Sequence, residues 1–199
     1  MLFSTLILIA FMIGGIPSSY ILVRIIHKKD IRQIGSGNPG ATNVFRSIDK
    51  KTGWAVLAFD IFKGWLAVAV LTSPTMACLS SSRDTAAFVV GLCAILGHVF
   101  SPYLKFKGGK GVATSAGVGL AVFPIPFGFA FIVWAILLRL TRIMSVASIV
   151  SAWVFFLSSI LFLDNAWHCA LAFLVALFIT WTHRSNLKRL HQGTEPKFF

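Results

Sequence analysis

Long apolar stretches that are almost free of charged residues restrict the fold of this sequence more than any other feature. Seven of them follow one another along the 199 residues: 4–23, 53–72, 85–104, 112–123, 125–138, 145–163 and 166–182. A helix needs about 20 apolar residues, rising about 1.5 Å each, to cross the hydrocarbon core of a bilayer. Five of the stretches approach that length. The sequence therefore predicts an all-α, polytopic integral membrane protein of about seven transmembrane helices.

The two stretches on either side of Pro124 and Pro126 are shorter than the others, at roughly 13 residues each. They are compatible with two short, tilted spans. They are equally compatible with a re-entrant hairpin buried in protein, since irregular backbone survives at membrane depth only where protein or water surrounds it. Both arrangements leave the flanking loops on the same face. The spans use most of the chain, so we expect residues 1–199 to form a single transmembrane domain.

Composition agrees with a protein dissolved in lipid, because 57% of the residues are hydrophobic and only 12% are charged. Soluble proteins carry about 25% charged residues. The net charge of +12 would suggest nucleic acid in a soluble protein. Here the basic residues lie between apolar stretches, where they report membrane topology, so we expect no nucleic-acid partner.

The distribution of lysine and arginine predicts which face each loop occupies. Sixteen of the eighteen lie in loops that would share one face, and these loops are 24–51, 105–110, 139–142 and 184–197. The opposite face holds only Arg83. By the positive-inside rule, the N-terminus lies outside and the C-terminus is cytoplasmic. The first basic residue, Arg24, follows the first apolar stretch, so 4–23 is expected to be a retained transmembrane helix and not a cleaved signal.

The remaining basic residue, Lys63, is expected near the cytoplasmic end of the second helix, one turn after Asp60. Two interpretations of this pair stay open. It is either a local ion pair that makes both groups tolerable near lipid, or a polar wall of an active site, since charges within a membrane are rare.

The first polar motif is an unbroken run of nine residues, GSGNPGATN, at 35–43. Its three glycines have the spacing of a dinucleotide-binding loop, but that motif requires a preceding strand, and here a membrane helix precedes it. Glycines still let backbone N–H groups approach an anion. Neutral polar side chains and an arginine, which suits phosphate, add further donors: Ser36, Asn38, Thr42, Asn43 and Arg46. The motif predicts a phosphate site.

The second motif, KFKGGKG at 105–111, places three lysines among glycines. It is not a Walker A loop, because Gly111 follows Lys110 where that motif has serine or threonine. The lysines and the start of the next helix favour an anion. A third group, in the C-terminal tail, contains His183, Asn186, Arg189 and Glu195. By itself this tail is typical of a basic juxtamembrane segment. All three motifs are expected on the cytoplasmic face.

The three phrases GSGNPGATNVFR, GHVFSPYLKFKGGKGVAT and HRSNLKRLHQGTEPK resemble the signatures of the bacterial acyl-phosphate:glycerol-3-phosphate acyltransferase family, PlsY. The resemblance covers nearly the whole chain, with one departure: Ser101 stands where the family usually has an aromatic residue before the proline. It implies transfer of a fatty acyl group from acyl phosphate to the 1-hydroxyl of glycerol 3-phosphate, which gives lysophosphatidic acid and phosphate. It also implies the bacterial inner membrane as location, with the active site on the cytoplasmic face.

The same resemblance implies the site residues. The expected catalytic residues are Ser36, Arg46, Lys110, His183 and Asn186. The residues expected to bind substrate phosphate are Gly35, Gly37, Asn38, Gly40, Thr42, Asn43, Lys105, Lys107, Gly108, Gly109, Gly111, Arg189 and Glu195. The expected partners are glycerol 3-phosphate, a long-chain acyl phosphate and membrane lipid, with the enzyme that supplies acyl phosphate as a further candidate.

The residues favour direct transfer without a covalent enzyme intermediate, because no serine or cysteine lies beside an obvious base in an elbow motif. The base is expected to be either a substrate phosphate oxygen or His183, with His98 as a lesser candidate. The six acidic residues form no metal motif, so we expect no metal and no cofactor. The main alternative is a transporter of a phosphorylated metabolite, whose site would lie near the bilayer midplane between repeats. A scaffold that binds anionic lipids through its basic loops is a second alternative.

Overall fold

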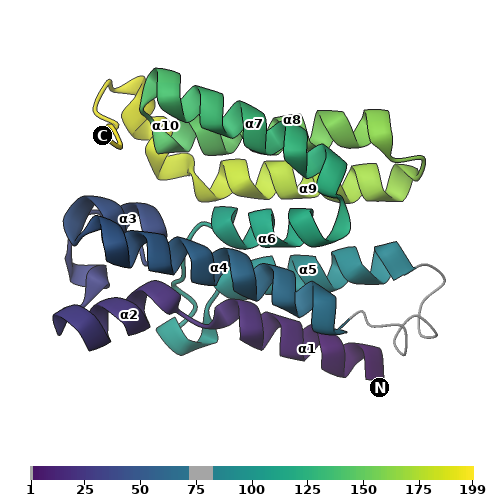
Figure 1. Ribbon diagram of the computed structural model, residues 1–199, viewed down its shortest axis with the longest axis horizontal. Coiled ribbons are helices and arrows are strands. Elements are labelled where there is room, and N and C mark those ends of the chain that lie inside the picture. Colours follow the sequence, from purple (N-terminus) through teal and green to yellow (C-terminus); the bar gives the residue numbers. More distant parts are fainter. Residues whose placement is uncertain (1, 72–82) are drawn as a thin grey trace. The chain divides into compact units, whose positions relative to one another are not determined.

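The computed structural model describes residues 2–71 and 83–199, and every long element in them is an α-helix (Figure 1). These residues divide into two compact units, 1–122 and 123–199. The first unit contains α1 (Leu2–Gly15), α2 (Ser18–His27), α3 (Ala41–Ser47), α4 (Lys50–Leu71), α5 (Arg83–Val99), α6 (Val112–Val122) and two short 3₁₀ turns, η1 (Ile31–Gln33) and η3 (Pro102–Leu104). The second contains α7 (Pro124–Thr141), α8 (Met144–Phe162), α9 (Ala166–Thr182) and α10 (Arg184–His191). The predicted all-α class is confirmed.

Five helical segments of the described residues are long and apolar enough to cross a membrane: Ser4–His27, Lys50–Val70, Asp84–Leu104, Pro124–Thr141 and Met144–Phe162. A sixth span results if α9 and α10, which meet at a bend of 59°, count as one. Large apolar side chains on these helices are exposed, among them Leu8, Trp54, Ile132 and Leu161. Such outward-facing apolar residues are what a lipid environment requires. The membrane class is therefore supported, with fewer long spans than the predicted seven.

The pair of short segments predicted around Pro124 differs from the expectation in its lengths. Helix α7 has 18 residues, because it begins at Pro124 and continues through Arg139 to Thr141. Proline is favourable in a first turn, where its missing N–H needs no partner. Helix α6 has only 11 residues, which amounts to about 16 Å of helix against a hydrocarbon core of about 30 Å.

The first span is not the single helix that its apolar stretch suggested. Helix α1 ends at Gly15 and α2 begins at Ser18, with Pro17 between them. Proline lacks an N–H and its ring clashes with the preceding turn, so the helix ladder stops here. The carbonyls of Gly15 and Ile16 are instead satisfied from other elements, by Ser101 and Lys63.

Glycines bring two helix pairs of the first unit into very close contact. A Cβ on Gly97 of α5 would lie 2.0 Å from the carbonyl oxygen of Phe11 in α1, and one on Gly117 of α6 would lie 1.9 Å from that of Ile61 in α4. Small residues at such crossings let membrane helices pack without a hydrophobic driving force. These contacts hold α1 against α5 and α4 against α6, as Figure 1 shows.

The segment that carries the first polar motif is anchored by a small apolar core. Val23 of α2, Ile31 of η1, Val44 of α3 and Val56 of α4 are fully buried against one another. Burying a side chain of this size contributes about 1.5–3 kcal/mol in water. The core fixes residues 31–47 onto α4.

The second unit is built on α8, which packs against both α7 and α9. Ser158 of α8 donates a hydrogen bond to the carbonyl of Pro126 in α7 at 3.2 Å. The indole of Trp153 donates to the hydroxyl of Thr180 in α9, also at 3.2 Å. At the end of this unit, the N–H of Phe198 donates to the carbonyl of Arg142. The C-terminal tail therefore lies beside the α7–α8 loop, and these two basic segments share one end of the unit.

Candidate active site

The buried side chain of Asn43 stabilises the first motif through three hydrogen bonds. Its amide Nδ2 donates to the carbonyls of Ile34 at 2.9 Å and Ile31 at 3.3 Å, and its Oδ1 accepts from the N–H of Ser36 at 3.0 Å. The side chain is buried. Asn43 therefore holds the glycine turn in place and fixes the backbone of Ser36, which stays exposed.

The shape of the first motif depends on its glycines. Gly35 and Gly37 have positive φ values of 60° and 70°, a conformation that disfavours a side chain. Gly40 then opens α3, on which Thr42 and the half-buried Arg46 are carried.

The second motif folds back onto the end of α5. The N–H of Gly108 donates to the carbonyl of Val99 at 2.9 Å, and that of Gly109 donates to the carbonyl of His98 at 3.1 Å. These bonds satisfy carbonyls that the end of a helix otherwise leaves without partners. Lys105 and Lys107 remain exposed, while Lys110 is half-buried directly before Gly111 and the first turn of α6.

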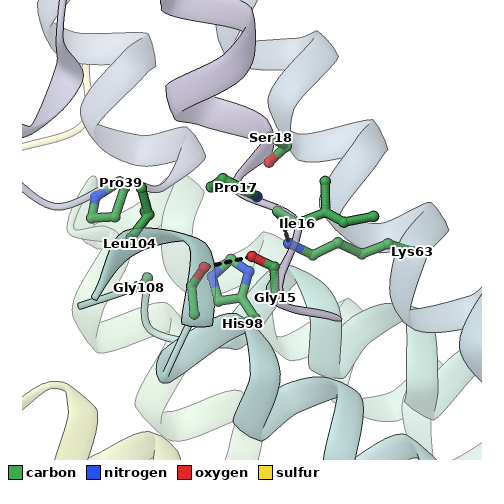
Figure 2. A pocket seen from close by; sticks show the side chains of 11 residues that line it. Gly15, Ile16, Pro17, Ser18, Pro39, Lys63, His98, Leu104 and Gly108 are labelled. Carbon is green, nitrogen blue, oxygen red and sulfur yellow. Dashed lines mark hydrogen bonds between the residues drawn. The ribbon is translucent and has the colours of Figure 1, made fainter. Parts of the chain in front are cut away.

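The first two motifs meet at a small pocket within the first unit (Figure 2). Pro39 of the first motif and the two glycines of the second, Gly108 and Gly109, line it together. The rest of the wall comes from the α1–α2 break, from α4, from the end of α5 and from η3 with its cap: Gly15, Ile16, Pro17, Ser18, Lys63, His98, Ser101 and Leu104. The structure thus brings together two segments that are about 70 positions apart in the sequence.

Asp60 lies close to three residues that line this pocket, Ser18, Lys63 and His98. Its Oδ1 accepts from the hydroxyl of Ser18 at 2.7 Å and pairs with the ammonium of Lys63 at 2.7 Å, and the His98 Nδ1 lies 3.6 Å away. Of the two interpretations left open for Asp60 and Lys63, the local ion pair is therefore present, and Lys63 also lines the pocket. Its predicted position is wrong, because α4 begins at Lys50 and ends at Leu71, so Lys63 lies well inside the helix. Lys63 is buried there, where residues of the α1–α2 break, the end of α5 and the second motif line the same pocket.

The tail motif is assembled in the second unit around Glu195. This carboxylate accepts from Asn186 at 2.6 Å, from Ser145 of α8 at 2.8 Å and from Arg189 at 2.7 Å, and its side chain is 2% exposed. Burial alone would raise the pKa of Glu195, but the bonds from Asn186, Ser145 and Arg189 outweigh it and hold the pKa below its usual range. The Arg189 charge is largely offset by this contact.

His183 occupies the bend between α9 and α10. Its Nδ1 lies 2.8 Å from the carbonyl oxygen of Ile179, which can only accept, so Nδ1 carries the proton. In the neutral imidazole, Nε2 is then the basic nitrogen. His183 and Asn186 are linked through the backbone, because the N–H of Asn186 donates to the carbonyl of His183 at 2.9 Å, and both side chains are buried.

The structure therefore groups the predicted site residues into two sets. One set lies around the glycine motifs of the first unit, and the other lies around Glu195 in the second. Ser18 and Ser145 were missed by sequence reasoning. Only the position of Ser18 directly after Pro17 could have suggested it, because a helix break exposes polar backbone that side chains must satisfy. Among the described residues no three His, Cys, Asp or Glu side chains are grouped as metal ligands, and metal-independent activity stays a prediction.

Comparison with known proteins identifies the family of this chain. A family described as "Glycerol-3-phosphate acyltransferase" matches residues 4–193. Proteins named glycerol-3-phosphate acyltransferase from Staphylococcus aureus strains RF122 / ET3-1 and JH9 are each 43% identical to this chain, over 99% of it and 98% of their own length.

Two solved structures are also similar. The glycerol 3-phosphate form of PlsY (YgiH), an integral membrane glycerol 3-phosphate acyltransferase, has a TM-score of 0.89 at 32% identity and covers 99% of this chain and 96% of its own. The lysophosphatidic acid form has a TM-score of 0.86 at 32% identity and covers 98% and 94%. The chain belongs to the glycerol-3-phosphate acyltransferase family.

Proposed function

We propose that this membrane-bound acyltransferase takes its acyl group from acyl phosphate. Transfer to the 1-hydroxyl of glycerol 3-phosphate gives lysophosphatidic acid and inorganic phosphate. The activity toward glycerol 3-phosphate follows from the family, and one observation supports a phosphate-bearing donor. Two separate glycine-containing motifs, both with cationic residues, lie next to each other in the first unit, where Pro39 and Gly108 line one small pocket. The phosphate is proposed to bind at the motifs and not inside that pocket.

The charges of the two substrates explain why so many cations are needed. Each phosphate carries about −1.5 to −2 charges near neutral pH. Two such groups about 5 Å apart repel each other by on the order of 13 kcal/mol at an effective dielectric of about 20, before screening. Arg46 from the first motif and Lys105, Lys107 and Lys110 from the second supply positive charge against this repulsion.

The reaction requires an alcohol to attack an activated carbonyl carbon. A bond forms between the 1-oxygen and that carbon, and the bond from the carbon to the phosphate oxygen breaks, with its electron pair leaving on phosphate. Backbone N–H groups and cations stabilise the oxyanion that develops. No covalent enzyme intermediate is needed, because phosphate is already a good leaving group.

The hydroxyl proton goes either to a substrate phosphate oxygen or to His183. The structure supports His183 as a candidate because the hydrogen bond from Nδ1 to Ile179 leaves Nε2 as the basic nitrogen. The contacts of Glu195 favour an orienting role within the site: a carboxylate repels phosphate, but here it holds Asn186 and Arg189.

We further propose that the N-terminus lies outside, that the C-terminus and the three motifs lie on the cytoplasmic face, and that the membrane is the bacterial inner membrane. Within each unit, one structural observation supports a shared face for its basic loops. In the first unit, Pro39 and Gly108, from basic loops assigned to the same face, line one pocket. In the second unit, Phe198 of the basic tail bonds to Arg142 of the basic α7–α8 loop.

The decisive experiment compares acyl donors. The purified protein in detergent would receive labelled glycerol 3-phosphate with palmitoyl phosphate, palmitoyl-CoA or palmitoyl carrier protein. We expect label in lysophosphatidic acid with palmitoyl phosphate only. Product with the thioesters alone would refute the donor assignment and keep the acyltransferase. Binding of glycerol 3-phosphate without product from any donor, in folded protein, would favour transport.

A further inference from the structure

The first unit contains a buried charged cluster, Asp60, Lys63 and His98, which the reaction described above does not use. These side chains are 1%, 3% and 7% exposed. Burying an ion pair costs desolvation energy that the attraction between the partners often fails to recover. Ionisable residues inside membrane segments are accordingly rare, and where they occur they are usually functional.

His98 connects this cluster to the glycine loop of the second motif. It lies in the last turn of α5, and its carbonyl accepts the N–H of Gly109 at 3.1 Å. The imidazole also lies against the same glycine, because a Cβ on Gly109 would come within 2.2 Å of His98 Nε2. His98 therefore contacts Gly109, the residue directly before Lys110, through both its backbone and its imidazole.

Asp60 and Lys63 brace His98 against the rest of the unit. Asp60 Oδ1 lies 3.6 Å from His98 Nδ1 and accepts from Ser18 of α2 at 2.7 Å. The ammonium of Lys63 lies 2.7 Å from the same oxygen and donates to the carbonyl of Ile16 at 2.8 Å, and Figure 2 shows the Lys63 side chain reaching toward Ile16. The cluster thus links α4, the break in the first span and the glycine loop.

The size of the pocket indicates how the cluster acts. The space lined by Lys63, His98 and the glycines has room for about one water molecule, which is too little for a phosphate group. The cluster is therefore placed to act on a phosphate through the loop that lies over it.

A simpler role would be to cap the broken helix. Lys63 and Ser101 do satisfy the carbonyls of Ile16 and Gly15. Capping explains a donor at each carbonyl, but it does not explain a buried carboxylate placed between Lys63, Ser18 and His98.

We propose that Asp60, Lys63 and His98 are positioning residues for the phosphate-binding loop 108–111. The inference rests on the proposed function, in which this loop binds substrate phosphate. It predicts that a disturbed cluster weakens phosphate binding while the reacting groups stay intact. A helix cap alone would affect the amount of folded protein and nothing else.

The test uses the paired variant Asp60→Asn/Lys63→Gln, which removes both charges and leaves no unpaired buried ion. His98→Gln is a second variant that reaches the loop directly. His168→Gln is the matched control, because His168 is another buried helix imidazole, packed on Phe123 in the second unit. Steady-state constants would be measured for both substrates, and glycerol 3-phosphate binding would be measured by calorimetry without a donor.

We expect the paired variant and His98→Gln to raise KM for at least one phosphate substrate by about tenfold or more, with kcat within about threefold of the parent. The control variant His168→Gln should have the kcat and KM of the parent. Folded variants with the parent's kcat and KM would overturn the proposal. It would also be overturned if the variants gave less folded protein and that folded protein had the parent's kcat and KM. The calorimetric comparison does not depend on the donor, so failure of the acyl phosphate assignment would be seen separately.

Discussion

Asn186 donates a hydrogen bond from Nδ2 to Oε1 of Glu195 at 2.6 Å, and Glu195 also accepts from Arg189 and Ser145. One buried carboxylate therefore holds two of the three basic or amide side chains of the tail motif in a defined orientation. Bonds of this kind to a charged group are worth about 1.5–3 kcal/mol each.

Replacing Glu195 should lower activity, and the loss should depend on how many hydrogen-bond acceptors the new side chain keeps. We expect Glu195→Ala to reduce kcat/KM by about 100-fold, because Asn186 and Arg189 both lose their acceptor. Glu195→Gln keeps one carbonyl acceptor and should lose less. Steady-state kinetics with both substrates would measure this. Equal activity in all three proteins would contradict an orienting role.

The lowered pKa of Glu195 predicts acid sensitivity. Since the folded-state pKa lies below the unfolded value, the ionised carboxylate contributes stability that is fully present above the unfolded pKa. That contribution is lost as pH falls through the folded pKa. The thermal midpoint of the parent protein should therefore drop as pH falls from above the ordinary pKa of a glutamate to below the lowered pKa of Glu195. Glu195→Gln should show a smaller drop, and an identical drop in both proteins would assign the acid effect to other groups.

His183→Gln tests the proton acceptor. If Nε2 takes the hydroxyl proton, kcat should fall by about 100-fold or more with little change in KM. The measurement is turnover at saturating concentrations of both substrates. Near-full turnover would exclude His183 and assign the proton to a substrate phosphate oxygen.

Gly109→Ala should impair phosphate binding, because the new methyl group would collide with the His98 imidazole. We expect KM for a phosphate substrate to rise by about tenfold or more, since the loop must move. Gly128→Ala is the control: it lies in α7 with no heavy atom within 4 Å of the added Cβ. Alanine is the better helix former by about 0.5–1 kcal/mol, so this variant should keep full activity and an equal or higher thermal midpoint.

Chelation should leave the reaction unaffected. In the proposed function, lysine and arginine neutralise the phosphate charges that metal ions often neutralise in phosphoryl chemistry, so we expect full turnover in excess EDTA. Activity would be compared in EDTA alone and in EDTA with added Mg²⁺. Loss in EDTA with recovery on Mg²⁺ would show that a metal takes part.

Sequence by itself was enough to predict the all-α class, the membrane environment and the family. Each depends on signals that are local in the chain: apolar stretches of about 20 residues and three uninterrupted motifs. The apolar stretches did not reveal the break at Pro17 or the true extent of α7, because proline ends a helix in one context and begins it in another. The roles of the individual motif residues stay predictions.

Only the tertiary structure decided which polar groups are partners. Asp60 accepts from Ser18, 42 positions away, and Ser101 donates to Gly15, 86 positions away. Nothing in the local sequence selects such pairs. The helix break frees the carbonyl that Ser101 satisfies, and the carboxylate of Asp60 is buried, so in both cases a buried polar group takes the partner that packing brings to it.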